Sequence, residues 1–206
     1  MNLKKTFKLL IMSLLPIGSF GQLQVEAVIG HHNYRYQQNY NTKFLKNNWG
    51  FSHVSSLLEL YSADAKTEIM TQSYITYNLY PAVKIGMGTY YASKPGFSPS
   101  VNLQFIKKGK NYSFIITPRI DLTWHPAWDV LAAVEFRPKL NANNNYYFRI
   151  QTLDNFTGTK HNRSYQYIKL GLERKRMLFG IAADFDAYGS HLNYAQNFGV
   201  FLISVL

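Results

Sequence analysis

The chain has 206 residues, a formal net charge of +11, no cysteine and a mean hydropathy of −0.20. Hydrophobic residues make up 47%, aromatic residues 16% and charged residues 16%, where an average soluble domain has roughly 25% charged residues. This composition excludes a disordered chain, a disulfide scaffold and a bundle of membrane helices. It is typical of a single all-β domain, including one that crosses a membrane with strands.

The first 21 residues have the pattern of a cleaved signal peptide. Three lysines precede a short apolar run from Leu9 to Leu15, and small residues, Ser19 and Gly21, stand at the −3 and −1 positions before Gln22. The apolar run is too short to span a membrane. We therefore expect Sec-dependent export and a mature chain that begins near Gln22, which N-terminal sequencing would test. That mature chain has 19 Lys and Arg against 11 acids, a charge of +8.

After residue 22, apolar and polar residues alternate in segments that turn residues separate, as in half-buried strands. In the clearest segment, Tyr112 to Leu122, Phe114 and Ile116 share one face and Arg119 lies on the other. Pro118 cannot donate to a strand ladder, so we expect a β-bulge there. We predict strands near 50–62, 67–80, 82–93, 98–107, 111–122, 128–138, 145–153, 164–173, 177–187 and 197–206.

Residues 23–36 form an eleventh extended segment in this pattern. A bacterial single-chain barrel has an even number of strands. The segment is therefore either part of an N-terminal extension over 22–48 or the partner of a further strand around 40–47. The predicted fold class is all-β: a closed antiparallel up-and-down transmembrane β-barrel of about ten strands, with eight or twelve as the alternative counts.

The polar faces of the predicted strands hold most of the charges and several glycines. Small residues suit a crowded interior that must accommodate large side chains, so we expect the polar face inside the barrel and the apolar face against lipid. Aromatic residues near the strand ends would form interfacial girdles. The carboxylates assigned to the inside are Glu59, Glu68, Asp121, Asp129, Glu135, Glu173, Asp184 and Asp186. The girdle residues are Tyr80, Tyr91, Tyr112, Trp124, Trp128, Tyr146 and Tyr188.

An alternative arrangement is a periplasmic lipocalin-like carrier, in which the apolar face points inward and the chain dissolves without detergent. In the membrane arrangement, a barrel of this size has an interior largely filled by side chains. We therefore expect a narrow or closed channel and not a wide porin. The interior side chains would include Arg119, Arg137, Arg149, Tyr74, Tyr90 and Tyr147.

The chain ends in an apolar segment, Phe198 to Leu206. With the signal peptide and the alternating segments, this ending resembles the small outer-membrane β-barrel proteins of Gram-negative bacteria over residues 22–206, although Leu206 replaces their usual terminal aromatic residue. The resemblance implies a monomer in the cell outer membrane that contacts outer-membrane lipids and lipopolysaccharide and is inserted by the barrel-assembly machinery. The basic runs 107–110 and 174–176 are interpreted as solvated turns near an anionic surface, not as a nucleic-acid groove.

The sequence contains no P-loop, dinucleotide-binding fingerprint or zinc-protease motif. His31 and His32 would point to opposite faces of a strand and so cannot bind one metal ion together. Asp184 and Asp186 share a face, an arrangement that suits acid–base chemistry, Ca²⁺ binding or an internal ion-pair network. We expect the ion-pair network, and no catalytic, cofactor or metal-binding residue.

His53 and Ser55 share a strand face with Glu59, and a histidine beside a serine can activate its hydroxyl as a nucleophile. The spacing resembles the His-x-Ser of outer-membrane lipid A 3-O-deacylases, which carry an asparagine where this chain has Ser56. Those enzymes display the site toward lipid, whereas the apolar alternation over Val54–Leu60 predicts that His53 faces the interior. The favoured function is a non-enzymatic outer-membrane barrel with a structural, narrow-pore or surface-interaction role. A lipid A-modifying enzyme that uses His53 and Ser55 is the alternative.

Overall fold

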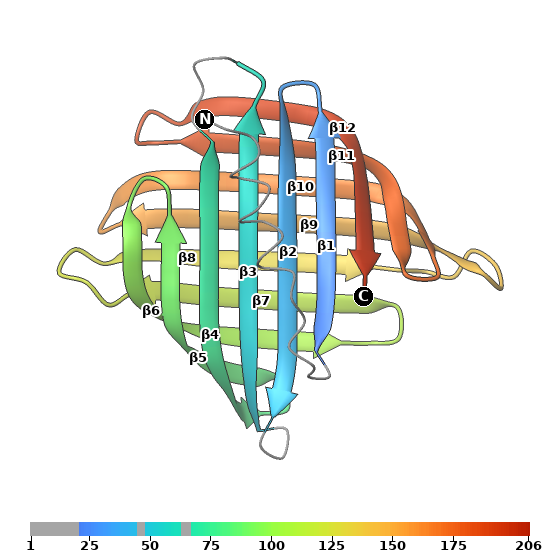
Figure 1. Cartoon of the computed structure of the whole chain (residues 1–206), viewed down its shortest axis with the longest axis horizontal. Coiled ribbons are helices and arrows are strands. Elements are labelled where there is room, and N and C mark those ends of the chain that lie inside the picture. Colours follow the sequence, from blue (N-terminus) through green and yellow to red (C-terminus); the bar gives the residue numbers. More distant parts are fainter. Residues whose placement is uncertain (1–20, 45–47, 63–66) are drawn as a thin grey trace, which may run out of the picture.

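The computed structural model describes residues 21–44, 48–62 and 67–206, which form a closed barrel of twelve antiparallel strands (Figure 1). The predicted signal peptide lies outside these residues, except for Gly21. The strands are β1 (Gln22–Gly30), β2 (Asn33–Phe44), β3 (Trp49–Leu60), β4 (Glu68–Tyr80), β5 (Val83–Ala92), β6 (Gly96–Lys108), β7 (Tyr112–Asp121), β8 (Ala127–Phe136), β9 (Asn144–Thr157), β10 (Lys160–Arg174), β11 (Met177–Tyr188) and β12 (Asn193–Val205).

Each strand pairs with its neighbour in sequence, and β1 closes the barrel on β12. Gln24 pairs with Val205 and Gly30 with Gly199, so both ends of the barrel sequence lie at one end, which we call the termini end. Strands β1–β4 form the wall in front in Figure 1 and cross the direction of β7–β11 behind them, while the last part of β12 runs beside β1. Among the described residues, no helix is long and apolar enough to cross a membrane.

The barrel class is confirmed, and the strand count is twelve. The extended segment predicted at 23–36 is divided by a turn at His31 and His32, so that it supplies β1 and the first part of β2. The prediction of an N-terminal extension is therefore wrong, because residues from Gln22 onward complete the wall. Most residues of β2 are polar, so its two faces show no contrast in the sequence. The structure identifies β2 as a strand by its pairing with β1 and β3.

The bulge predicted at Pro118 is also wrong. Pro118 pairs with Val130 without a shift of register. On its other side, the β6–β7 ladder omits the pairs between Asn102–Arg119 and Phe105–Ile116 but resumes in the same register. The proline therefore interrupts hydrogen bonding, because it has no N–H to donate, without adding a residue.

The outer wall of the barrel is apolar, as predicted. Directly paired residues share a face, and apolar side chains on the outer face are widely exposed: Met87 by 66%, Ile181 by 62% and Val200 by 57%. The inner face holds buried charges such as Lys169 and Asp184. This distribution contradicts the soluble carrier, whose apolar face would be inside. Of the predicted girdle, Tyr188 is wrong, because it points inward and its hydroxyl bonds Glu68.

The lumen beside β9–β12 and β1 is filled by side chains. An apolar cluster at the termini half of this wall consists of Val28, Tyr147, Leu178, Ala182, Phe201 and Ile203. Close backbone approaches explain several inward glycines of the sheet. A Cβ on Gly88, for example, would lie 1.9 Å from the carbonyl oxygen of Ser73.

Candidate functional site

The predicted His53–Ser55 pair lies on the outer wall, and not in the interior as predicted. Ser52 pairs with Tyr74, which is buried in the lumen, and Phe51 pairs with Ile75, whose side chain is 54% exposed outside. Even-numbered residues of β3 therefore face inward and odd-numbered residues face lipid. The prediction exchanged the inner and outer faces of β3, because both faces of this strand carry leucines and serines.

His53 is held between two serine hydroxyls. Its Nε2 lies 2.7 Å from Oγ of Ser55, and its Nδ1 lies 2.8 Å from Oγ of Ser73 on β4. The Gln38 side-chain amide donates to Ser55 Oγ at 3.4 Å, and Thr71 lies 3.5 Å from the same oxygen. We call this group, formed by Gln38, His53, Ser55, Thr71 and Ser73, the outer polar cluster.

Glu59 does not take part in this cluster. It shares the outer face of β3 with His53 but lies six residues away, about 20 Å at the rise of a strand. Its carboxylate accepts a 2.5 Å hydrogen bond from the hydroxyl of Tyr34. The prediction that Glu59 faces the interior is wrong, and it cannot orient His53.

An apolar groove lies on the same outer wall, beside the outer polar cluster. It has a volume of about 520 Å³. Its lining comes from the outer faces of β3–β6, and Phe51, which is paired with the groove residue Ile75, is next to His53 on the outer face of β3. The lining residues are Trp49, Ile75, Tyr77, Ile85, Met87 and Val101.

Asp184 and Asp186 belong to the predicted ion-pair networks of the lumen. Arg35 binds Asp184 and Glu26, each at 3.1 Å, and Lys169 binds Glu26 at 2.7 Å. Asp186 accepts from Arg163 at 2.6 Å. Each aspartate is thus bound by an arginine, as expected of an internal ion-pair network.

Two further networks fix the arginines that the sequence placed inside. Arg119 binds both Asp121 and Asp129, and its guanidinium lies 3.7 Å from the ring centre of Tyr90. Near the termini end, Glu135 accepts from Arg137 at 2.7 Å and from Arg149 at 3.2 Å. Since these pairs are buried or half-buried, they brace the sheet and narrow the lumen.

The opposite inner wall, formed by β2–β4, is uncharged and mostly polar through its middle, although Val54, which the sequence assigned to lipid, also points inward there. Its inward residues Gln37, Asn39, Ser52, Ser56 and Gln72 share the faces of Arg35 and Tyr74. All five are half-buried, in contrast to the buried residues of the facing wall. Because they point into the barrel, their exposed surface must border open space in the lumen. We call these residues the lumen strip.

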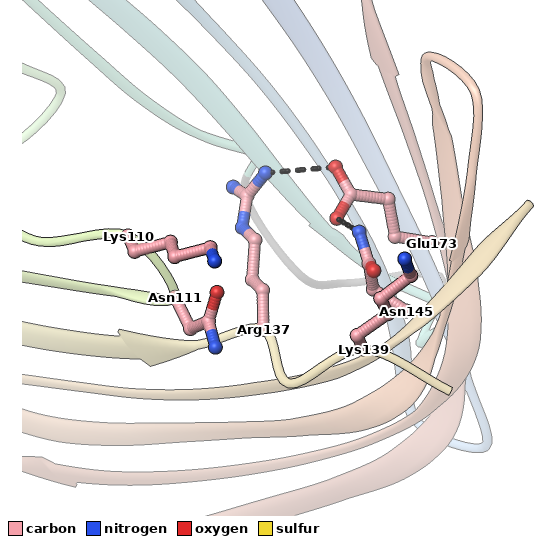
Figure 2. Close-up of a pocket in the computed structure, with 6 residues that line it drawn as sticks. All are labelled: Lys110, Asn111, Arg137, Lys139, Asn145 and Glu173. Atoms are coloured by element: carbon pink, nitrogen blue, oxygen red, sulfur yellow. Dashed lines mark hydrogen bonds and ion pairs between the residues drawn. The ribbon is translucent and has the colours of Figure 1, made fainter. Parts of the chain in front are cut away.

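A cavity of about 480 Å³ opens at the termini end. In Figure 2, Arg137 extends toward Glu173, and Lys110 and Asn111 approach from the other side. Arg137 and Asn145 each donate to Glu173 at 3.0 Å. Lys139 completes the lining. Of the basic runs that the sequence indicated at this end, 107–110 contributes Lys110 to the lining, and 174–176 contributes none.

Sequence reasoning missed a second histidine–serine pair, at the end of the barrel opposite the termini. Ser164 donates to Asp154 at 2.6 Å and lies 2.7 Å from Nε2 of His161. The Nδ1 of His161 contacts the carbonyl of Gly189 at 2.8 Å. Here the serine lies between the acid and the histidine, so the carboxylate competes for the serine proton and does not orient the base. This arrangement ties two hairpins together and lacks the geometry of a nucleophile.

The two adjacent histidines lie in the β1–β2 turn, and not on opposite faces of a strand as predicted. The ring centres of His31 and His32 are 4.0 Å apart. His31 Nδ1 accepts from the backbone N–H of Phe198 at 2.9 Å, which occupies one possible ligand atom. Within residues 21–44, 48–62 and 67–206, no three metal-binding side chains come together.

No known protein-family model matches the sequence, and no curated protein does. Among solved structures, the NanC porin is similar, with a TM-score of 0.51 and 14% identity over 90% of this chain and 99% of that one. The KdgM porin in complex with disordered oligogalacturonate has a TM-score of 0.51 and 8% identity over 89% of this chain and 98% of that one. The likeness establishes the fold, that of an outer-membrane β-barrel, and the apolar outer wall fits that membrane.

Proposed function

We propose that the protein is a narrow pore for small polar solutes, with its passage along the lumen strip. The observation that carries this proposal is the contrast between the two inner walls. The wall of β9–β12 is buried under paired charges and apolar side chains, whereas the strip of amides and hydroxyls on β2–β4 keeps exposed surface inside the barrel. Amide and hydroxyl groups can replace the hydration of a passing solute without trapping it. The similarity in fold to two porins is in keeping with this role.

A tryptophan in the strip tests the pore. In planar bilayers, Ser56→Trp is expected to lower the single-channel conductance several-fold, because the indole fills the space beside the strip. Leu57→Trp is the matched control. Leu57 pairs with the exposed Ile69 and faces lipid, so the conductance of this variant should equal that of the wild type. Absence of a channel in the wild-type protein, or equal effects of the two variants, would refute the passage.

A second function, hydrolysis of an acyl ester in a membrane lipid, is favoured by the outward position of the outer polar cluster. Polar side chains on a lipid-facing wall are costly. Here they surround a serine and histidine in hydrogen-bond contact, beside an apolar groove. Outer-membrane lipids and lipopolysaccharide are the partners we predict for this surface.

The chemistry would begin with Ser55 Oγ attacking the ester carbonyl while His53 Nε2 accepts its proton. Ser73 would hold the Nδ1–H, and the Gln38 amide would donate to the oxyanion. The protonated His53 would return the proton to the leaving alcohol, and water would then hydrolyse the acyl-serine. Ser73 is neutral, so it stabilises the imidazolium less than a carboxylate does.

Mass spectrometry of lipid A and phospholipids from cells that overproduce the protein tests the second function. A lost acyl chain is expected with the wild type, with a rate about 10²–10⁴-fold lower for His53→Ala and no loss for Ser55→Ala. Ser56→Ala, which changes the adjacent inward serine, is the control and should retain the activity. Unchanged lipids with the wild-type protein would leave the outer polar cluster without catalytic function.

A further inference from the structure

The mouth of the barrel at the termini end carries a set of lysines. Lys43, Lys84 and Lys108 lie at the ends of β2, β5 and β6, and each alternates in phase with the buried lumen residues of its strand. Their side chains therefore project into the mouth. Lys110 and Lys139 line the cavity at the same mouth (Figure 2). We call these five residues the lysine ring.

The charge of the lysine ring is not compensated. The two side-chain carboxylates at this mouth, Glu135 and Glu173, are bound by Arg137 and Arg149. In the part of the chain that the structure describes, no lysine of the ring takes part in an ion pair. Lys43 and Lys108 are close enough to Lys84 for their charges to repel it. Like charges around a cavity with low-dielectric walls concentrate counter-ions there.

The ring lies where the lumen strip reaches the mouth. Along the inner face of β2, the residues toward the termini end are Gln37, Asn39, Asn41 and then Lys43. A solute that follows the uncharged strip therefore meets the lysines at one end only. At the other end, acids and bases alternate: Arg163 binds both Glu68 and Asp186.

Resting on the pore proposed above, we propose that the lysine ring is an anion-selecting vestibule, which draws small solutes bearing carboxylate or phosphate groups into the passage. Rings of lysine select anions in other pores by the same electrostatics. Ammonium groups on flexible stems act as point charges without the fixed two-point geometry of arginine. They can thus attract an anion without holding it in one pose, as conduction requires.

The range of this field sets how the selectivity should depend on salt. The Debye length is about 10 Å at 0.1 M ionic strength and about 3 Å at 1 M. At 0.1 M salt, the field of the separated lysines extends across the mouth and acts on passing ions. At 1 M salt, this field is screened. We therefore expect anion selectivity to decline as the KCl concentration rises.

Reversal potentials of the full-length mature protein in a KCl gradient across a planar bilayer test the proposal. The wild type is expected to pass chloride several-fold better than potassium, and inorganic phosphate is expected to reduce the chloride current. Lys43→Gln/Lys84→Gln/Lys108→Gln should bring the permeability ratio close to 1 and abolish the effect of phosphate. The matched control, Arg174→Gln/Lys175→Gln/Arg176→Gln, removes three charges from the β10–β11 turn at the same end and should keep most of the selectivity.

The outcomes separate the vestibule from the pore. A current with no preference for chloride, or equal losses in the two triple variants, overturns the vestibule and leaves the pore standing. Absence of any current overturns both. A shift in electrophoretic mobility between unboiled and boiled samples verifies that each variant is folded. If the triple lysine variant does not fold, the single change Lys108→Gln must still lower the ratio, and an unchanged ratio overturns the vestibule.

Discussion

Ile116→Arg is expected to destabilise the barrel by roughly 2–4 kcal/mol, the cost of a cation on the lipid face at the bilayer midplane. Ile116 lies in the middle of β7 and pairs with Phe105 and Ala132, on the same face as the exposed Phe114. An arginine at this position would either lose its hydration or distort the surrounding lipid. Because folded proteins are only about 5–15 kcal/mol more stable than their unfolded states, such a loss should also reduce the assembled fraction.

Urea-induced unfolding in lipid vesicles, followed by tryptophan fluorescence, measures this effect. Ser56→Arg is the control: it adds the same side chain to the lumen strip and is expected to change the free energy of unfolding much less, because its guanidinium stays in water. Ile116→Leu should be close to neutral. If Ile116→Arg were tolerated and Ser56→Arg were not, the inner and outer faces would be reversed.

Arg35→Met is expected to lower the free energy of unfolding by about 3–5 kcal/mol, because it leaves carboxylates buried without a partner. Arg35 is 5% exposed, bridges Glu26 and Asp184, and lies 4.0 Å from the ring centre of Tyr167. Glu26 keeps Lys169, so most of the cost should come from Asp184. The measurement is the same unfolding experiment in vesicles.

A double variant identifies the source of that cost. Arg35→Met/Asp184→Asn removes the orphaned charge with its partner and should recover part of the lost stability. Arg137→Met is the control for a more exposed network, since its side chain is 31% exposed; a loss near 1 kcal/mol or less is expected. Equal losses for Arg35→Met and Arg137→Met would mean that the lumen is hydrated throughout.

Alternation was sufficient to predict the barrel and the inner and outer faces of β7, β8, β10 and β11, where apolar residues on one face oppose charged residues on the other over much of each strand. It failed on β2 and β3. Gln37, Gln38 and Asn39 give no contrast between faces, and β3 places leucines on both. The phase of such a strand is fixed by its neighbours: Tyr74 in the lumen decides that Ser52 is inside.

The uncertain phase of β2 and β3 also limited what could be predicted of the candidate sites. His53 and Ser55 were recognised by their spacing, but their exposure to lipid depends on the phase of β3, and Ser73 and Gln38 come from β4 and β2. The lysine ring combines residues from different strands and turns between positions 43 and 139, so barrel closure is needed to bring them together. By contrast, the ion pair of Asp186 with Arg163 followed from an acid and a base on the inner faces of the adjacent strands β11 and β10. Asp184 binds Arg35 of β2, so that pair depends on barrel closure.

Both proposed sites depend on one structural statement: β3 directs Ser56 into a water-filled lumen and Ser55 toward lipid. The chain has no cysteine, so Ser55→Cys and Ser56→Cys can each be labelled uniquely in vesicles with a membrane-impermeant, charged thiol reagent. Rapid labelling of Ser56→Cys and protection of Ser55→Cys are expected, with both reacting after denaturation. Rapid labelling of Ser55→Cys together with protection of Ser56→Cys would contradict the account, because it would put the lumen strip in lipid and His53 inside the barrel.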